Sequence, residues 1–214
     1  MQRNGSDGPS HGTIPHVLNR SLPTPAGARL SLREWTDRDR EPFERLCADP
    51  VVMQHFPAPL TPAATSSLLD QIGQSWDRDG FGLWAVELTR AAPTGPAPFI
   101  GFTGLARCDW LVPGAVEVGW RLAAEHWGHG YAPEAATLAL AVAFLDLGLD
   151  EVVSFTVPAN TRSRRVMEKI GMVHEPDRDF DHPRVDPVAH PHLVHHVLWS
   201  VTRADWLALH ADHV

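Results

Sequence analysis

Hydrophobic and polar residues alternate over residues 29–35 (R-L-S-L-R-E-W), which predicts a β-strand with one buried face. Further apolar and β-branched runs, bounded by Gly, Pro or Asp, predict five more strands, and another strand is expected to begin at Met172. The links between residues 82 and 122 are short, with a turn at 92–96, so three of these strands are expected to form an antiparallel meander. The five runs cover residues 82–88, 99–109, 115–122, 151–157 and 192–201.

The hydrophobic period changes to that of a helix after Gly130, where a broad apolar face predicts a long helix ending at Gly148. Pro42 lacks an N–H, so the regular part of the first helix is expected to begin late. The order of elements predicts an α+β domain around a single mixed sheet, without an internal repeat or a second domain. Shorter helices are expected over residues 36–48, 63–79 and 160–171, and from Thr202 onward.

The N-terminal segment differs in composition from the rest of the chain. Residues 1–28 are rich in Gly, Pro, Ser, Asn and His and show no periodicity, so we expect a flexible arm before a domain over residues 29–214. The start of the chain lacks the apolar core of a signal peptide, and no run of about 18 apolar residues is present. We therefore expect a cytoplasmic protein that does not interact with a membrane.

Charge narrows the class of partner. The 18 Lys+Arg residues and 26 Asp+Glu residues give a formal net charge of −8, which disfavours a nucleic-acid partner and mildly favours a cationic one such as an amine. The two cysteines, Cys47 and Cys108, fit neither a disulfide scaffold nor a metal-ligand pattern, and we expect two buried, reduced thiols. No metal site is expected.

A glycine pair precedes the long helix. Gly128 and Gly130 form a G-x-G where the helix begins, and the free N–H groups of a helix start offer an anion site to which a backbone can come close. A plain tight turn is the alternative interpretation. The spacing is not that of a dinucleotide-binding fingerprint, because residue 133 is Pro.

Two motifs in sequence carry a family resemblance. The first is W-G-H-G-Y-A-P-E-A at residues 127–135, and the second is N-x-x-S-x-x-V-M-E-K-I-G-M at residues 160–172. Together they resemble the GNAT superfamily of acyl-CoA-dependent N-acetyltransferases, and within it the RimJ/RimL group of ribosomal-protein N-terminal acetyltransferases. The resemblance extends over roughly residues 29–206. It implies a seven-stranded, mostly antiparallel sheet with a V-shaped splay between the fourth and fifth strands.

The resemblance also implies how acetyl-CoA is bound. The loop after the fourth strand would hold the pyrophosphate with backbone N–H groups, and the pantetheine arm would lie in the splay. Asn160 would hold the pantetheine or its adjoining loop, and Ser163 would lie near the sulfur. The family often has Gln or Arg where this chain has Glu125, so we expect backbone contacts to dominate. The remaining cofactor-binding residues are Trp120, Arg121, Leu122, Trp127, Gly128, His129, Gly130, Tyr131 and Ala132.

The implied reaction is direct acetyl transfer from acetyl-CoA to a primary amine, in a ternary complex. Attack requires the amine to lose a proton, and Glu117 is the candidate base; a surface or salt-bridged strand glutamate is the alternative interpretation. Met167 stands where many relatives have a tyrosine acid, and the only tyrosine, Tyr131, lies in the loop. Ser163 is therefore the candidate acid, with helix capping beside Asn160 as its alternative role.

Other interpretations stay open at this point. A non-catalytic acyl-CoA-binding sensor or interaction module on the same fold is the competing function, and the acceptor is either a protein N-terminus or a small amine. Homodimers are common in this superfamily, so a dimer is left open. A cluster of histidines near the C-terminus is expected on a solvated loop and an edge strand of the acceptor side rather than around a metal. These residues are His182, His190, His192, His195 and His196.

Overall fold

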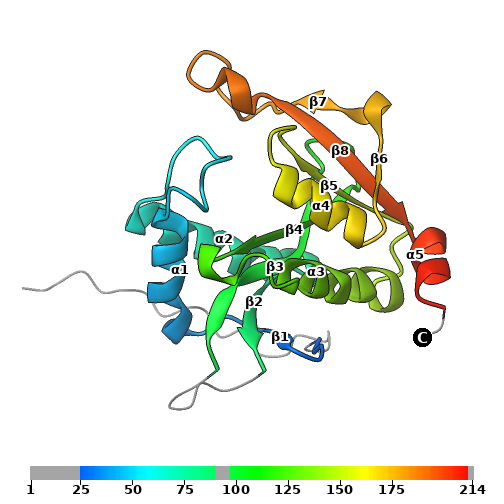
Figure 1. Ribbon diagram of the computed structural model, residues 1–214, viewed down its shortest axis with the longest axis horizontal. Helices are drawn as coiled ribbons and strands as arrows, with labels where there is room; N and C mark the ends of the chain where they lie inside the picture. The colour runs from blue at the N-terminus through cyan, green and yellow to red at the C-terminus, as the bar shows by residue number, and fades with distance from the viewer. Residues whose placement is uncertain (1–24, 90–96, 212–214) are drawn as a thin grey trace, which may run out of the picture.

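The computed structural model describes residues 25–89 and 97–211 (Figure 1). Residues 1–24 of the expected arm, and the turn expected at 92–96, lie outside the described residues. Residues 25–28 are described: the Gly27 amide donates to the carbonyl of Leu30, and the carbonyl of Pro25 accepts from the amide of Leu32. The strands are β1 (Leu30–Arg33), β2 (Leu83–Leu88), β3 (Phe99–Arg107), β4 (Val116–Leu122), β5 (Glu151–Thr156), β6 (Val173–His174), β7 (Phe180–Asp181) and β8 (His195–Thr202).

The strands form one mixed sheet in the order β1-β2-β3-β4-β5-β8-β6, with β7 paired to β8. Every neighbouring pair is antiparallel except β4 and β5, which run parallel. This confirms the mostly antiparallel α+β sheet, but eight strands replace the expected seven. The additional strand, β7, is two residues long, too short to produce an alternating pattern.

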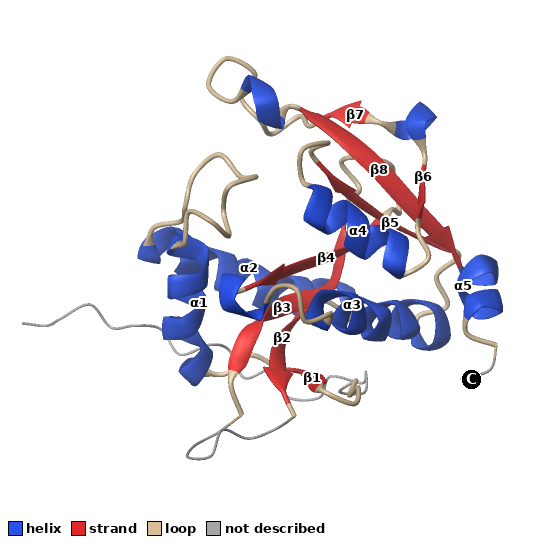
Figure 2. Ribbon diagram, viewed as in Figure 1, coloured by secondary structure: helices blue, strands red, loops and turns tan. Residues whose placement is uncertain are grey.

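The expected splay is present between the fourth and fifth strands. Strands β4 and β5 are in register at a single pair, Glu117 and Val153, while β4 stays paired to β3 as far as Leu122. Strand β5 stays paired to β8 as far as Thr156. The two halves of the sheet therefore meet near Glu117 and separate toward the carboxyl ends of β4 and β5 (Figure 2).

The helices follow the sequence signals closely. A 3₁₀ turn precedes the first helix, which tolerates Pro42 because its third residue needs no intrahelical N–H bond. The Thr61 hydroxyl caps the second helix by accepting from the amide of Ala64 at 3.2 Å. The helices are α1 (Arg40–Ala48), α2 (Pro62–Asp79), α3 (Tyr131–Ala141, continued by a π-helical turn at Val142–Asp146), α4 (Thr161–Lys169) and α5 (Arg203–Leu209). None of the helices in the described part of the chain is long and apolar enough to cross a bilayer.

The alternation of side chains gives the sheet two distinct sides. Strand register places Ala85, Phe102 and Arg121 on one face, where Phe43 of α1 packs against Phe102 with ring centroids 5.8 Å apart. Trp120, one residue before Arg121, therefore points to the opposite face. Helices α3 and α4 contact each other and lie together over one side of the sheet (Figure 1).

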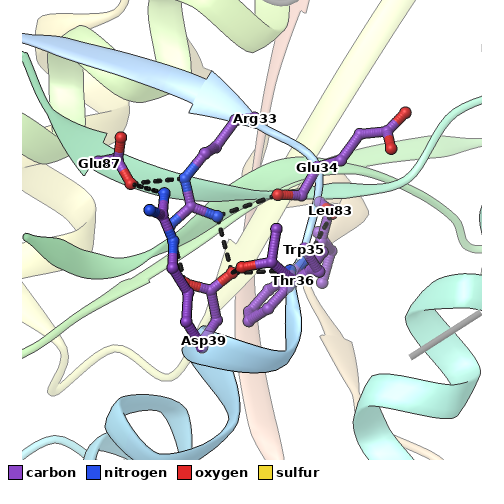
Figure 3. A network of polar contacts seen from close by, with 8 residues as sticks. Arg33, Glu34, Trp35, Thr36, Asp39, Leu83 and Glu87 are labelled. Carbon is purple, nitrogen blue, oxygen red and sulfur yellow. Dashed lines mark hydrogen bonds and ion pairs between the residues drawn. The ribbon is translucent and has the colours of Figure 1, made fainter. Parts of the chain in front are cut away.

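A buried ion-pair network fixes the corner between β1 and α1 (Figure 3). Arg33 donates two hydrogen bonds of 2.7 Å to the carboxylate of Asp39, which is 1% exposed, and a third of 2.7 Å to Glu87 of β2. The same Asp39 accepts from the Thr36 amide at 2.8 Å. Charged hydrogen bonds of this kind hold α1, and the loop that follows it, at a set position against the sheet.

Glycine is required where β3 passes its neighbours. Gly101 has φ of 144° and Gly104 has φ of 155°, in a region that residues with a side chain rarely adopt. A Cβ at Gly101 would overlap the carbonyl oxygen of Arg121, and one at Gly104 would overlap that of Gly82. The close approach at Gly101 sets the position of the last residues of β4, where the splay opens.

Candidate active site

A ring of unpaired amide groups surrounds the start of α3. Gly128 and Gly130 both have φ of 79°, which turns the backbone so that consecutive N–H groups face outward. The described residues provide no hydrogen-bond acceptor for the amides of residues 128–132, and a Cβ built on Gly128 would meet no described atom beyond its chain neighbours within 4 Å. Free amides at the positive end of a helix form an anion site, so this loop fits a pyrophosphate.

Arg29 holds this loop from the start of the domain. Its guanidinium donates to the carbonyl of His129 at 2.8 Å and to the carboxylate of Glu134 at 2.7 Å. Its Cζ atom lies 5.0 Å from the centre of the Tyr131 ring. Sequence reasoning missed both Arg29 and Glu134, because the contact joins residues 105 positions apart and no local pattern marks it.

Trp127 links the loop to the opposite side of the splay. Its indole N–H donates to the carbonyl of Leu122 at 2.8 Å, which anchors the loop to the end of β4. The guanidinium of Arg162, in the first turn of α4, lies 4.5 Å from the centre of the Trp127 ring. The start of α3 and the start of α4 are thereby brought together around the open end of the splay.

Asn160 and Ser163 form one hydrogen-bonded unit at the start of α4. The side-chain oxygen of Asn160 caps the helix by accepting from the Ser163 amide at 3.2 Å, and its amide nitrogen donates to Ser163 Oγ at 3.1 Å and to Thr156 Oγ1 at 2.9 Å. Capping is therefore a real role of Asn160. Ser163 Oγ accepts in this unit, which leaves its O–H group free to donate.

The three expected residues at the end of β4 face different surroundings. Leu122 is 4% exposed in the core, so only its backbone is available to a ligand. Trp120 and Arg121 are partly buried and point to opposite faces of the sheet. The structure thus brings together the loop and the start of α4 with Asn160 and Ser163, and it places Trp120 on the opposite face of the sheet from Arg121.

Glu117 lies at the point where the splay begins. Its Oε1 atom extends over Gly119, whose missing side chain leaves that stretch of β4 open. The described residues make no hydrogen bond or ion pair to this carboxylate, which excludes the salt-bridged interpretation among them. Desolvation raises the pKa of Glu117 to about 8.

A cluster of apolar side chains lies beside Glu117. Burial raises the pKa of the Cys108 thiol to about 12, with the nearby charge of Glu117 contributing. Cys108 packs with Val153 of β5 and Leu198 of β8 in a small apolar cluster, to which Trp110 is joined. These neighbours explain why the carboxyl group of Glu117 favours its neutral form.

The expectation of an edge strand is wrong for His195 and His196, which pair with β7, while His182 lies in a loop as expected; His182 and His196 are half-buried. Burial lowers the pKa of His182 and of His196, whose ring centroids lie 4.9 Å apart. Strand β7 pairs with β8 at His196, opposite Phe180, so this part of β8 is not an edge, and the two rings stack with centroids 5.7 Å apart. His192 and His195 are exposed as expected. The rings around His182 and His196 are Trp110, Phe155 and Phe180.

The loop between α1 and α2 closes the other side of this region. Phe56 of this loop is 43% exposed, and its ring centre lies 4.3 Å from Cζ of Arg121. Burial lowers the pKa of the neighbouring His55, and the charge of Arg162 contributes.

Two further residues singled out in the sequence differ in exposure: Glu125 is exposed and Met167 is 1% exposed. Within residues 25–89 and 97–211, no group of three His, Cys, Asp or Glu side chains is arranged to hold a metal ion.

Comparisons with known proteins agree with this geometry. Residues 29–173 match the family described as acetyltransferase (GNAT) domain. The FsC-acetyl coenzyme A-N(2)-transacetylase of Aspergillus fumigatus is 30% identical over 198 residues, covering 89% of this chain and 80% of that protein. The uncharacterized protein YkkB of Bacillus subtilis (strain 168) is 32% identical over 145 residues, 67% of this chain and 81% of its own. An acetyltransferase structure from Agrobacterium tumefaciens strain C58 has a TM-score of 0.67 at 29% identity, covering 87% of this chain and 98% of that one.

Proposed function

The chain belongs to the GNAT family of acetyltransferases, and we propose that it transfers an acetyl group from acetyl-CoA to a primary amine by direct transfer in a ternary complex. The observation that carries this proposal is Glu117, a carboxyl group without a partner among the described residues, which lies at the opening of the splay and whose pKa is raised to about 8. A base with such a pKa matches the task of deprotonating an amine near neutral pH. The name of the Aspergillus relative, an N(2)-transacetylase, supports a nitrogen acceptor.

Acetyl-CoA supplies the activated thioester, and this chain's residues bind and orient it. The free amides of residues 128–132 fit its pyrophosphate, with Trp127, His129, Tyr131 and Ala132 in the loop that carries them. The pantetheine arm lies between β4 and β5, where unpaired strand backbone is available beyond Glu117, along Trp120, Arg121 and Leu122. Asn160 holds the neighbouring backbone and orients Ser163.

The proton balance assigns roles to two side chains. The bound ammonium gives one proton to Glu117, and the neutral nitrogen then forms the C–N bond while the C–S bond of the thioester breaks. The departing thiolate takes a proton from the O–H group of Ser163 or from water, and that group regains one from the acetylated nitrogen as it becomes a neutral amide. Met167, buried and without a proton to give, has no part in this step.

A thiol-release assay with acetyl-CoA tests the proposal. The protein is incubated with a panel of amino acids, polyamines, amino sugars and N-terminal peptides, and acetylated products are identified by mass spectrometry. Turnover on at least one amine is expected. Tight binding of CoA without turnover on any acceptor would favour the non-catalytic acyl-CoA sensor instead.

Finer assignments belong to the same proposal. The two motifs at residues 127–135 and 160–172 support membership of the RimJ/RimL group, whose acceptors are protein N-termini. A cytoplasmic location, the absence of nucleic-acid and membrane partners, and a homodimeric state stay predictions, which fractionation and light scattering test. We also propose that residues 1–28 form an arm outside the catalytic domain of residues 29–214.

A further inference from the structure

The positively charged side chain of Arg121 lies on the α1 side of the sheet, where no acidic side chain of residues 25–89 or 97–211 forms an ion pair with it. Within the described residues its one hydrogen bond runs from Nη1 to Cys47 Sγ, at 3.4 Å, and its Nε is buried without a partner. Burial raises the pKa of Cys47, so this thiol stays neutral and does not balance the guanidinium. A half-buried cation without a counter-charge destabilises the fold, and a bound anion would remove that cost.

The unused donors of Arg121 have a defined shape. Because Nη1 is bound to Cys47, the edge of the guanidinium that carries Nε and Nη2 is left over. Two parallel N–H groups on one edge match the two oxygens of a carboxylate. Phe56 and Phe102 pack against the guanidinium, with ring centres 4.3 and 5.3 Å from Cζ. These two contacts limit the positions that the guanidinium can adopt.

The location of Arg121 points to the acceptor rather than to acetyl-CoA. Side-chain alternation puts Arg121 on the same face of β4 as Glu117 and on the opposite face from Trp120. The amides that fit the pyrophosphate lie beyond the end of β4, in the loop anchored at Leu122. Arg121 and Glu117 are four residues apart, with open Gly119 between them, over which the Glu117 carboxylate extends.

We propose that the acceptor is a primary amine that also carries a carboxylate, with Arg121 binding the carboxylate while the amine lies beside Glu117. This inference rests on the acetyl transfer proposed above and adds the chemical class of the acceptor. The acceptor enters past Phe56, which is 43% exposed and covers the guanidinium. A short carbon chain between amine and carboxylate spans the two groups.

The first test compares matched acceptors. Glycine, β-alanine, 4-aminobutyrate and 5-aminovalerate are each assayed against the corresponding amide, with phosphoethanolamine as an anion of different shape. A charged, two-pronged hydrogen bond predicts a kcat/KM roughly 10- to 100-fold higher for at least one free acid than for its amide. Equal values for every acid and amide pair, or a preference for phosphoethanolamine over all the acids, would contradict the proposal.

The second test removes the fork formed by the two parallel N–H groups, Nε and Nη2, of Arg121. Arg121→Gln is expected to abolish the preference by raising KM for the acid to that of its amide, because only the side-chain donors are removed and the backbone of residue 121 along the pantetheine is kept. Arg121→Lys keeps the charge without the fork, so it restores part of the preference. Arg45→Gln, on the exposed surface of α1, is the control and leaves all values unchanged. A raised KM for acetyl-CoA in Arg121→Gln would assign Arg121 to the cofactor instead.

A binding measurement separates this inference from the proposed function. N-acetylated amino acids and their amides are added to the protein together with CoA, and the melting temperature is measured. A carboxylate-dependent rise in wild type that is absent in Arg121→Gln supports the inference, even if no acceptor is turned over. Turnover of amines without any carboxylate-dependent rise would refute the role of Arg121 and leave the acetyl transfer intact.

Discussion

Replacing Glu117 with Gln is expected to make the folded protein more stable at alkaline pH. The folded state raises the pKa of this carboxyl from an ordinary value of 4.5 to about 8, because the group is desolvated and has no partner among the described residues. The unfolded chain therefore loses this proton at lower pH than the folded protein does. Below about pH 4.5 both the folded and the unfolded state hold the proton. Above about pH 8 both have lost it, and the folded state is then destabilised by a desolvated carboxylate.

The magnitude follows from the same values. A rise from 4.5 to about 8 corresponds to about 5 kcal/mol at about 1.4 kcal/mol per pKa unit. The side chain is partly exposed, and solvent screening reduces this to about 2–4 kcal/mol. The free energy of unfolding of wild type should fall by that amount, relative to Glu117→Gln, as the pH rises from 4.5 through 8.

Urea unfolding at pH 5.5, 7.0 and 8.5 measures this difference. The free energy of unfolding of Glu117→Gln, relative to wild type, should increase at each step in pH, and the variant should be the more stable protein at pH 8.5. Glu168→Gln, on the exposed side of α4, should have the same free energy of unfolding as wild type at each pH. A Glu117→Gln variant that is no more stable than wild type at pH 8.5 would refute the burial of an unpaired carboxyl.

Three further substitutions probe other parts of the site. Asp39→Ala removes the carboxylate that pairs with Arg33 and should lower the free energy of unfolding by about 3–5 kcal/mol. The control Asp70→Ala, at an exposed position, should lower it by about 0.5 kcal/mol or less, and a loss below about 1 kcal/mol for Asp39→Ala would show that the network is not needed. Arg29→Ala frees the loop and should raise KM for acetyl-CoA about fivefold with little change in kcat, a contact worth ~1 kcal/mol at this exposed site; an unchanged KM would remove its role in positioning the loop. Ser163→Ala should slow turnover by less than about tenfold because a thiolate leaves with little help, so a loss of a thousandfold would make Ser163 an essential acid.

Much of the fold is readable from the sequence because local patterns carry it. Polar and apolar side chains alternate over residues 29–33, and the helix after Gly130 has an apolar face and a glycine at each end, so both predictions rest on local residues alone. Strand β7 has two residues and forms only because β8 lies beside it, which no local pattern can report. The edge position expected for His196 failed for the same reason: strand order is set by pairing across the sheet.

The candidate site was predictable to a similar depth. The G-x-G and the N-x-x-S motif mark the loop and the start of α4 because both depend on local backbone geometry. Arg29 could not be found this way, since its partner Glu134 is 105 residues distant. Nor does the sequence tell whether Glu117 has a counter-ion, because that depends on which side chains fold against β4.

The pH dependence of kcat/KM, measured with an amine that the protein acetylates, tests the role of Glu117 most directly. For wild type, kcat/KM should rise with pH and level off above an apparent pKa near 8, as the carboxyl group becomes a base. The Glu117→Gln profile should lack that rise and lie roughly 10²- to 10⁴-fold lower at its plateau. A wild-type profile without this rise, or a Glu117→Gln variant with the wild-type rate and profile, would contradict general-base catalysis by Glu117.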